Sequence, residues 1–195
     1  GISKPQSKLG PQKFKFLNYT DDLNAKKGRS YAGNGLLWQY NLHYFDWLNS
    51  EGSCKWRDSN NEFLNIWLAI HKIGTSVSWD PYPTSLRIVN WIKYHNSCDG
   101  LSEEAISSLA LQAHWLEKNI EFHLLANHLF ANAKALVAAG CFFRGKLATR
   151  WLNKGLVILN KELDEQVLDD GGHFELSPMY HSIILEDILD LIALT

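Results

Sequence analysis

The sequence has little net charge and no long hydrophobic run, and each shortage excludes a class of protein. Its 19 lysine and arginine residues nearly balance 21 aspartate and glutamate residues. Binding nucleic acid through its phosphates needs a concentrated positive charge. No apolar stretch reaches the roughly 20 residues of a membrane-spanning helix, and no signal-peptide pattern opens the chain. We therefore expect neither a nucleic-acid partner nor a membrane span.

Cysteine is also scarce. Cys54, Cys98 and Cys141 are odd in number, widely separated and outside any CxxC pattern, so the sequence indicates neither a zinc site nor a disulfide framework. We expect buried or half-buried thiols. We expect no HxxxH or HxxE pattern to place two metal ligands on one helix face, so no metal or other cofactor is expected within this chain.

Length and composition predict one globular domain. The chain has 195 residues, of which 46% are hydrophobic and 12% aromatic, enough to bury a core. It starts at Gly1 and contains a single methionine, Met179, which we interpret as a sequence that continues upstream. Isoleucine and leucine cover nearly every face of residues 183–194, which predicts burial against further protein.

The chain divides into an arm and a helical domain. Residues 1–35 are rich in lysine, glycine and asparagine and predict a mostly irregular N-terminal arm, with one short strand possible. Residues 36–195 are expected to form an all-α domain. Within it, residues 36–48 alternate aromatic with polar side chains, which favours a half-buried strand whose end could equally open a short helix.

Hydrophobic spacing after that segment predicts six helices packed as antiparallel hairpins. The first ends at Gly74, a residue that tolerates the left-handed backbone of a helix end. The third begins at Ser102, a good N-cap. The sixth begins at Ser177-Pro178, with proline at the first helical position.

Two polar blocks fall at predicted helix starts. The first contains Asn127 and His128, and the second, DDGGHFELSPMYHSIILED, contains His173, Tyr180 and His181. Asn127 and Tyr180 are separated by 180 − 127 = 53 positions. Two helix starts of this kind can face one cleft, so the blocks predict a site.

Four segments together resemble a known family: NLHYFDW, WDPYPTSLRIVNW, NHLFANAKAL and GGHFELSPMYH. Their order and spacing are similar to those of the N-terminal helical domain of bacterial heparinase II/III-like polysaccharide lyases, over most of residues 36–194. The resemblance implies part of an incomplete α/α toroid of helical hairpins. A C-terminal β-sandwich domain, absent from this chain, would complete the cleft and could hold a metal. The location implied is periplasmic or secreted.

The same resemblance implies an activity. Family members cleave uronate-containing polysaccharides, such as the glycosaminoglycan heparan sulfate or alginate, by β-elimination. Their neutralising pair falls on Asn127 and His128, and their catalytic tyrosine falls on Tyr180. A further acid or base would come from the missing domain.

The chemistry suits these residue types. Removing the C5 proton of a uronate places a carbanion beside a carboxylate, which amide and imidazole donors can neutralise. A tyrosine can protonate the departing glycosidic oxygen, and can also act as the base if it lies near both atoms. Alternatively, a histidine of the missing domain is the base and Tyr180 is only the acid.

Six further residues are expected to contact the substrate: His43, Trp79, Arg87, Asn90, His173 and His181. Arg87 and Asn90 lie three apart on one helix face and could hold a sulfate or carboxylate, or serve as a surface ion pair and a polar cap. Trp79, in a proline-rich loop, suits stacking on a sugar ring, although large aromatic residues also dominate cores. Tyr180 itself could pack in a core, and Asn127 could be an N-cap.

Two other functions stay open. One is a non-catalytic carbohydrate-binding or assembly module of a polysaccharide biosynthesis or export system. The other is a glycoside hydrolase on a similar helical toroid, which needs two suitably spaced carboxylates. Glu186 and Asp187 argue against the hydrolase, because adjacent residues on a helix point in different directions.

Overall fold

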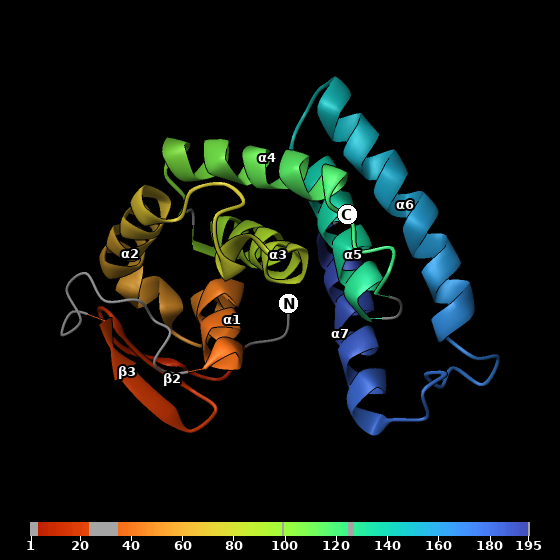
Figure 1. The fold of residues 1–195 in the computed structure, drawn as a ribbon, viewed down its shortest axis with the longest axis horizontal. Coiled ribbons are helices and arrows are strands. Elements are labelled where there is room, and N and C mark those ends of the chain that lie inside the picture. Colours follow the sequence, from red (N-terminus) through yellow and green to blue (C-terminus); the bar gives the residue numbers. More distant parts are fainter. Residues whose placement is uncertain (1–3, 24–34, 99, 125–126, 195) are drawn as a thin grey trace. The chain divides into compact units, whose positions relative to one another are not determined.

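The computed structural model describes residues 4–23, 35–98, 100–124 and 127–194 (Figure 1). Contacts between residues divide these into two compact units, one up to Leu109 and one from Ala110 onward. The described residues are predominantly helical, which confirms the expected all-α class. The predicted arm boundary at residue 35 stays a prediction, because residues 24–34 lie outside the described residues. No described helix is both long enough and apolar enough to cross a bilayer.

The arm contains a small antiparallel sheet where at most one strand was expected. Its strands β1 (Lys8–Gly10), β2 (Lys13–Phe16) and β3 (Tyr19–Asp22) pair in the order β1-β2-β3. In β2 the two phenylalanines are buried and the two lysines exposed, the period of a half-buried strand. Strands of three or four residues carry too little of this period to be recognised in a lysine-rich sequence.

Helix α1 (Leu36–Tyr44) replaces the predicted strand. Aromatic residues and a leucine occupy every second position from 38 to 44. The same residues also form two pairs with a spacing of four, 38 with 42 and 40 with 44. Trp38 and Leu42 face the core, whereas Tyr40 and Tyr44 stack on another face with ring centroids 6.5 Å apart. The pattern therefore fits the period of a strand and that of a helix, and only packing against the core decides between them. Phe45 ends the helix in the left-handed conformation at φ 60°.

An aromatic core fills the first unit. Around it lie the short helices η3 (Asp46–Asn49), η4 (Ser53–Trp56) and η5 (Val77–Trp79), together with α2 (Arg57–Ile70) and α3 (Pro81–Cys98). Phe45 lies at its centre, with ring centroids 5.3 Å from Trp47, 5.7 Å from Trp67 and 5.4 Å from Trp91. These tryptophans are buried, so most of the unusual tryptophan content of this unit serves the core.

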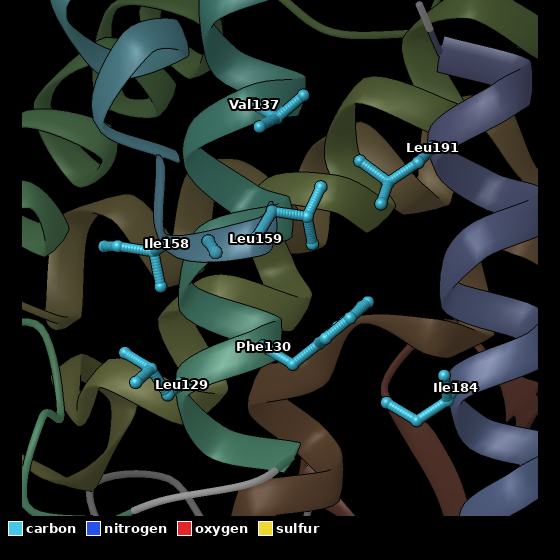
Figure 2. Close-up of a cluster of buried hydrophobic side chains, with 8 residues drawn as sticks. Leu129, Phe130, Val137, Ile158, Leu159, Ile184 and Leu191 are labelled. Carbon is cyan, nitrogen blue, oxygen red and sulfur yellow. The ribbon is translucent and has the colours of Figure 1, made fainter. Parts of the chain in front are cut away.

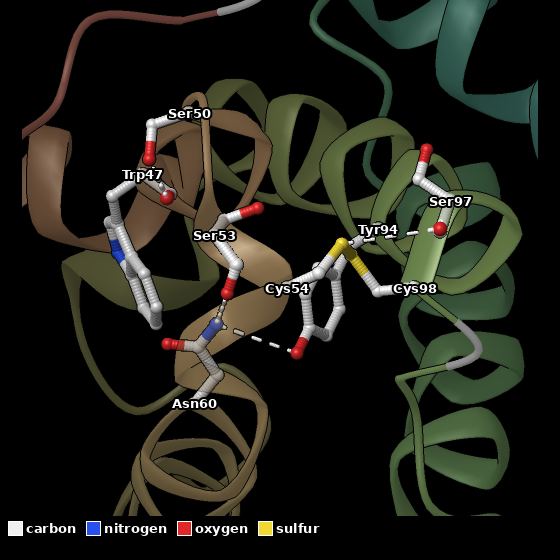
Figure 3. The surroundings of a disulfide bond; sticks show 8 residues. All are labelled: Trp47, Ser50, Ser53, Cys54, Asn60, Tyr94, Ser97 and Cys98. Atoms are coloured by element: carbon white, nitrogen blue, oxygen red, sulfur yellow. Dashed lines mark hydrogen bonds between the residues drawn. A yellow bond between two sulfur atoms is a disulfide. The ribbon is translucent and has the colours of Figure 1, made fainter.

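A disulfide joins Cys54 to Cys98, which corrects the expectation of three thiols (Figure 3). It links η4 to the last residue of α3 across a sequence separation of 44, with the Cα atoms 5.5 Å apart. Beside it, the Asn60 amide donates to the Ser53 carbonyl (3.2 Å) and to the Tyr94 hydroxyl (3.4 Å). The folding of α3 against η4 brings the sulfurs together, and sequence spacing alone does not indicate this. Cys141 is a half-buried thiol, as expected.

The second unit is built on a tight helical hairpin. Helix α4 (Glu103–Lys118) crosses the division between the units, and α5 (Asn127–Phe142), α6 (Lys146–Gln166) and α7 (Pro178–Leu194) follow. At the contact of α5 with α6, Gly155 leaves room for the backbone of α5: a Cβ on it would lie 2.9 Å from the Ala133 oxygen and the Val137 nitrogen. The six helices predicted from hydrophobic spacing correspond to α2–α7.

Candidate active site

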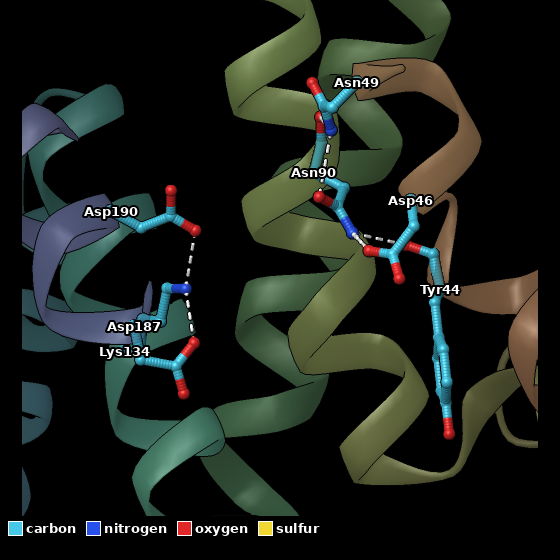
Figure 4. Close-up of polar contacts among 7 residues, drawn as sticks. All are labelled: Tyr44, Asp46, Asn49, Asn90, Lys134, Asp187 and Asp190. Carbon is cyan, nitrogen blue, oxygen red and sulfur yellow. Dashed lines mark hydrogen bonds and ion pairs between the residues drawn. The ribbon is translucent and has the colours of Figure 1, made fainter. Parts of the chain in front are cut away.

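Helices α5 and α7 pack side by side. The Lys134 ammonium of α5 lies 2.7 Å from an Asp187 oxygen and 2.8 Å from an Asp190 oxygen, both on α7 (Figure 4). The hydrophobic cluster beside this ion triad contains Phe130 and Val137 of α5 together with Ile184 and Leu191 of α7 (Figure 2).

The same cluster fixes the direction of the pair. In Figure 2, Val137 lies above Phe130 on α5, and Leu191 lies above Ile184 on α7. Both helices therefore run upward in this view, so they are parallel and begin at the same end.

The ion triad relates the positions of Tyr180 and Asn127. Each residue precedes one member of the ion triad by seven positions, since 187 − 180 = 7 and 134 − 127 = 7. Seven residues are about two helical turns, which return a side chain to the same helix face. Tyr180 and Asn127 therefore lie at one end of the pair, on the faces that α7 and α5 turn toward each other. The structure brings together the two helix starts that the sequence singled out.

His173 holds the ring of Tyr180. The two rings stack with centroids 5.8 Å apart and an interplanar angle of 26°. His173 is buried; its Nδ1 accepts from the Glu175 backbone N–H (3.3 Å) and its Nε2 lies 3.4 Å from Gln166 Oε1. Because Nδ1 accepts, the hydrogen bonds assign the proton to Nε2. His173, predicted to contact substrate, is instead enclosed behind the tyrosine.

The turn between α6 and α7 positions His173. Gly171 takes the left-handed conformation (φ 82°), and the Asp170 carboxylate accepts the Gly172 N–H at 2.8 Å. The chain then folds back, so that the Phe174 N–H donates to the Gln166 carbonyl at 3.0 Å. Helix α7 begins at Pro178, as the Ser-Pro pair predicted. His181, in the first turn of α7, is exposed and accessible to a ligand.

Glu121 orients the other side of the site. His128 Nδ1 lies 3.3 Å from a Glu121 carboxylate oxygen, and the His128 side chain is 34% exposed. The Glu121 backbone N–H donates to Asn132 Oδ1 at 2.9 Å, which ties this segment to α5. Such a bond on one ring nitrogen fixes the orientation of an imidazole. Asn127 and His128 are both half-buried at the first turn of α5.

Arg87, in the first unit, is completely buried. One guanidinium nitrogen donates to the Ser78 carbonyl (2.6 Å) and to the His43 carbonyl (3.4 Å), and the group lies 4.5 Å from the Trp67 ring centroid. Burial lowers the pKa of Arg87 to about 9. The residue fits neither the expected sulfate contact nor a surface ion pair, because solvent does not reach it. It stabilises the aromatic core by hydrogen bonding to carbonyls.

The other three candidates of the first unit are buried as well. Trp79 is 3% exposed and donates to the His71 carbonyl at 3.2 Å, so the expected stacking on a sugar is not supported. His43 accepts the Trp67 indole N–H at 3.1 Å. Burial, with His71 and Arg87 nearby, lowers the pKa of His43 well below its usual value.

Asn90 is a structural residue at the end of α1. Its amide donates to the Tyr44 carbonyl (2.8 Å) and to the Asp46 carboxylate (2.6 Å), and its oxygen accepts from Asn49 at 2.9 Å (Figure 4). These three bonds occupy the polar atoms that the predicted ion contact would need. Sequence spacing placed Asn90 correctly on a face with Arg87 but did not reveal that this face is covered.

Among the described residues, no group of three or more His, Cys, Asp or Glu side chains could hold a metal ion. The pair His114-x-x-Glu117 corrects the expectation that no HxxE pattern shares a helix face: both residues lie on α4, with His114 Nδ1 3.7 Å from a Glu117 oxygen. However, Arg150 and Trp151 bind the Glu117 carboxylate at 2.7 and 3.2 Å. The absence of a metal from this chain stays a prediction.

Comparison with known proteins identifies the family. Residues 8–195 match the family model described as Heparinase II/III N-terminus. The chain belongs to the heparinase II/III family. A heparin-sulfate lyase of Bacteroides thetaiotaomicron is 24% identical to it over 98% of the chain and 32% of the relative. A heparin-sulfate lyase of Pedobacter heparinus is 34% identical over 49% of the chain and 12% of the relative.

Solved structures agree on the fold. A crystal structure of heparinase III superposes with a TM-score of 0.64 at 26% identity, covering 78% of the chain and 26% of that protein. The heparan sulfate lyase of Pedobacter heparinus gives a TM-score of 0.67 at 22% identity, covering 93% and 32%. This heparinase II/III N-terminal region thus spans about a third of the length of the first of these curated relatives, and its predicted toroid class is confirmed.

Proposed function

We propose that this chain is the N-terminal part of a lyase that cleaves a uronate-containing anionic polysaccharide by β-elimination. One observation supports the proposal: Tyr180 and Asn127 each precede a member of the Lys134–Asp187 ion pair by seven residues, at the same end of the parallel helices α7 and α5. The relatives are named heparin-sulfate lyases, which favours heparan sulfate as the first substrate to test and alginate as the second.

The proposed reaction assigns a role to each side chain. Asn127 and His128 donate to the uronate carboxylate and stabilise the charge that develops when the C5 proton leaves. The C5 electron pair then forms the C4–C5 double bond as the C4–O bond breaks. Tyr180 protonates the departing oxygen. His173 stacks on the phenol ring and holds it in place, and Glu121 orients His128.

The base is either Tyr180 or a group of the proposed C-terminal β-sandwich domain, and solvent exchange distinguishes them. In deuterated water, the Tyr180→Phe protein would still exchange the C5 proton of bound substrate if another group is the base. Exchange would stop if Tyr180 is the base. No cofactor of this chain is needed in either scheme.

The main test uses the complete protein. Heparan sulfate should yield an unsaturated uronate that absorbs in the ultraviolet, and Tyr180→Phe should lower kcat by a factor of about 10² to 10⁴, the usual value of a general acid or base. Tyr19→Phe, at a 63% exposed tyrosine of β3, is the matched control and should leave kcat unchanged. Formation of saturated products, or no product from any uronate-containing polysaccharide, would rule out the proposal.

The Cys54–Cys98 disulfide supports a periplasmic or secreted location, because such bonds persist in oxidising compartments. Labelling of free thiols in protein taken directly from its native cells tests this. Within residues 1–195, only Cys141 is expected to be labelled. Labelling of Cys54 and Cys98 as well would contradict this location.

A further inference from the structure

An open groove of about 710 Å³ lies along the N-terminal half of α6, within the second unit. Its volume falls in the range of ligand sites in proteins, roughly 300 to 1,000 Å³. Phe122 and Val157 present exposed apolar surface to it, 58% and 72% exposed, and Ile158 is buried at its base. The remaining lining is polar: Lys146, Thr149, Arg150, Asn153 and Lys154.

The groove is distinct from the candidate active site. Helices α5 and α6 are antiparallel, since Gly140 meets Leu152 and Gly155 meets Val137. The N-terminal half of α6 therefore lies along the C-terminal half of α5. Asn127 is at the opposite end of α5, where α7 begins.

Positive charge follows one side of the groove. Lys146, Arg150 and Lys154 are spaced four apart and so share one face of α6, about 6 Å apart along its axis. The Glu117 carboxylate pairs with Arg150 through two oxygens, at 2.6 and 2.7 Å, and Lys154 donates to the Glu117 backbone carbonyl at 2.7 Å. Lys146 makes no hydrogen bond or ion pair within the described part of the chain. Around the groove, three cations thus face one carboxylate.

Helix stability does not explain these charges. The first turn of a helix carries the positive end of its dipole, where a cation such as Lys146 is unfavourable by some tenths of a kcal/mol. Helix α6 has no acidic residue in its first turn and no basic residue in its last, the reverse of the favourable arrangement. An anionic ligand in the groove would offset this unfavourable interaction.

We propose that this groove binds a segment of acidic glycan as a second site, separate from the site at Tyr180. A sugar ring offers an apolar face, which suits Phe122 and Val157, next to carboxylate or sulfate groups, which suit Lys146 and Lys154. The Asn153 amide is exposed beside them and can bond hydroxyl groups. The choice of an acidic glycan rests on the proposed function. The second site holds the polymer while the active site cleaves it.

The test compares polymer with a short substrate in the complete protein. The groove variant Phe122→Ala/Lys146→Ala removes the apolar platform and the unpaired cation. The control, Lys161→Ala, removes an exposed lysine of the same helix outside the groove. We expect the groove variant to raise KM for long heparan sulfate by about tenfold, equivalent to about 1.4 kcal/mol. The kcat and KM for a tetrasaccharide should not change, and neither should the melting temperature.

Three results would overturn the inference. One is an unchanged KM for the polymer in the groove variant, and another is an equal rise in Lys161→Ala. The third is a structure of the complete protein in which another of its segments fills the groove. If the wild type forms no elimination product, calorimetry still tests the inference by comparing the affinities of the wild type and the groove variant for heparan sulfate. Weaker binding by the groove variant supports the second site, and equal binding contradicts it. Failure of the proposed function is thereby distinguished from failure of the second site.

Discussion

Replacement of Lys134 by methionine tests whether the ion triad holds α5 against α7. The ammonium lies 2.7 and 2.8 Å from two carboxylates, and the side chains of Lys134 and Asp190 are each 5% exposed. Methionine keeps most of the volume but leaves two acidic groups facing each other. Removing one partner of a buried ion pair typically costs about 3 to 5 kcal/mol. We expect the opening free energy of α5 and α7 to fall by about this amount at pH 7. Hydrogen exchange of the α5 and α7 amides in the complete protein measures it.

The loss should depend on pH. Burial already raises the pKa of Asp187 above its usual value, even though Lys134 opposes this. Without the ammonium the pKa of this carboxyl rises further, so the folded state binds a proton more tightly than the unfolded state. Stability of the variant then increases as pH falls from 7 toward 5. Mutating both aspartates to leucine in the same protein should recover much of the loss, because no buried charge remains.

Two results would refute this reasoning. A loss below about 1 kcal/mol at pH 7 would mean that the triad does not hold α5 against α7. A loss of the same size at pH 5 and pH 7 would mean that uncompensated carboxylates are not its cause. Lys161→Met, at an exposed lysine, is the control and should have little effect.

Three further predictions concern stability and positioning. Replacing Cys54 and Cys98 by serine should lower the free energy of unfolding by about 2 to 4 kcal/mol, seen in urea denaturation, and reductant should then have no further effect. Gly155→Val should lower the melting temperature sharply, because a Cβ there already meets the α5 backbone at 2.9 Å. His173→Ala should lower kcat more than it raises KM, since His173 stacks on Tyr180 without being accessible to substrate; an unchanged kcat would contradict its positioning role.

The sequence predicted long elements well and short ones poorly. Helices α2–α7 carry several turns of hydrophobic spacing, and Pro178 marks the start of α7. The strands of the arm and helix α1 are too short for the period to decide between alternatives. The pairing of Cys54 with Cys98 depends on a contact between η4 and α3, which no local pattern encodes.

The candidate site was predicted in part, and burial explains the difference. Asn127 and Tyr180 stood out because they lie in the first turns of helices, and the fold puts both at the same end of two parallel helices. Arg87, Asn90 and Trp79 carry suitable chemistry, but their faces are covered. Sequence alone does not show which face of a helix a neighbour will cover.

The ion triad also has a signal in the sequence. Lys134 and Asp187 are separated by 187 − 134 = 53 positions, the same offset as Asn127 and Tyr180. A repeated offset between two polar blocks indicates two parallel helices in fixed register, which sequence inspection can detect. Glu121 had no such signal, because its role depends on its contacts with His128 and Asn132 in the fold.

The most direct measurement of the central claim is a double-mutant cycle at Asn127 and Tyr180. The complete protein, Asn127→Ala, Tyr180→Phe and the double variant are compared by kcat/KM on heparan sulfate. If both side chains act on one sugar in one transition state, the double variant should be much less impaired than the product of the two single effects. Independent, multiplicative effects would contradict a shared site, and full activity in Tyr180→Phe would remove the tyrosine from the chemistry altogether.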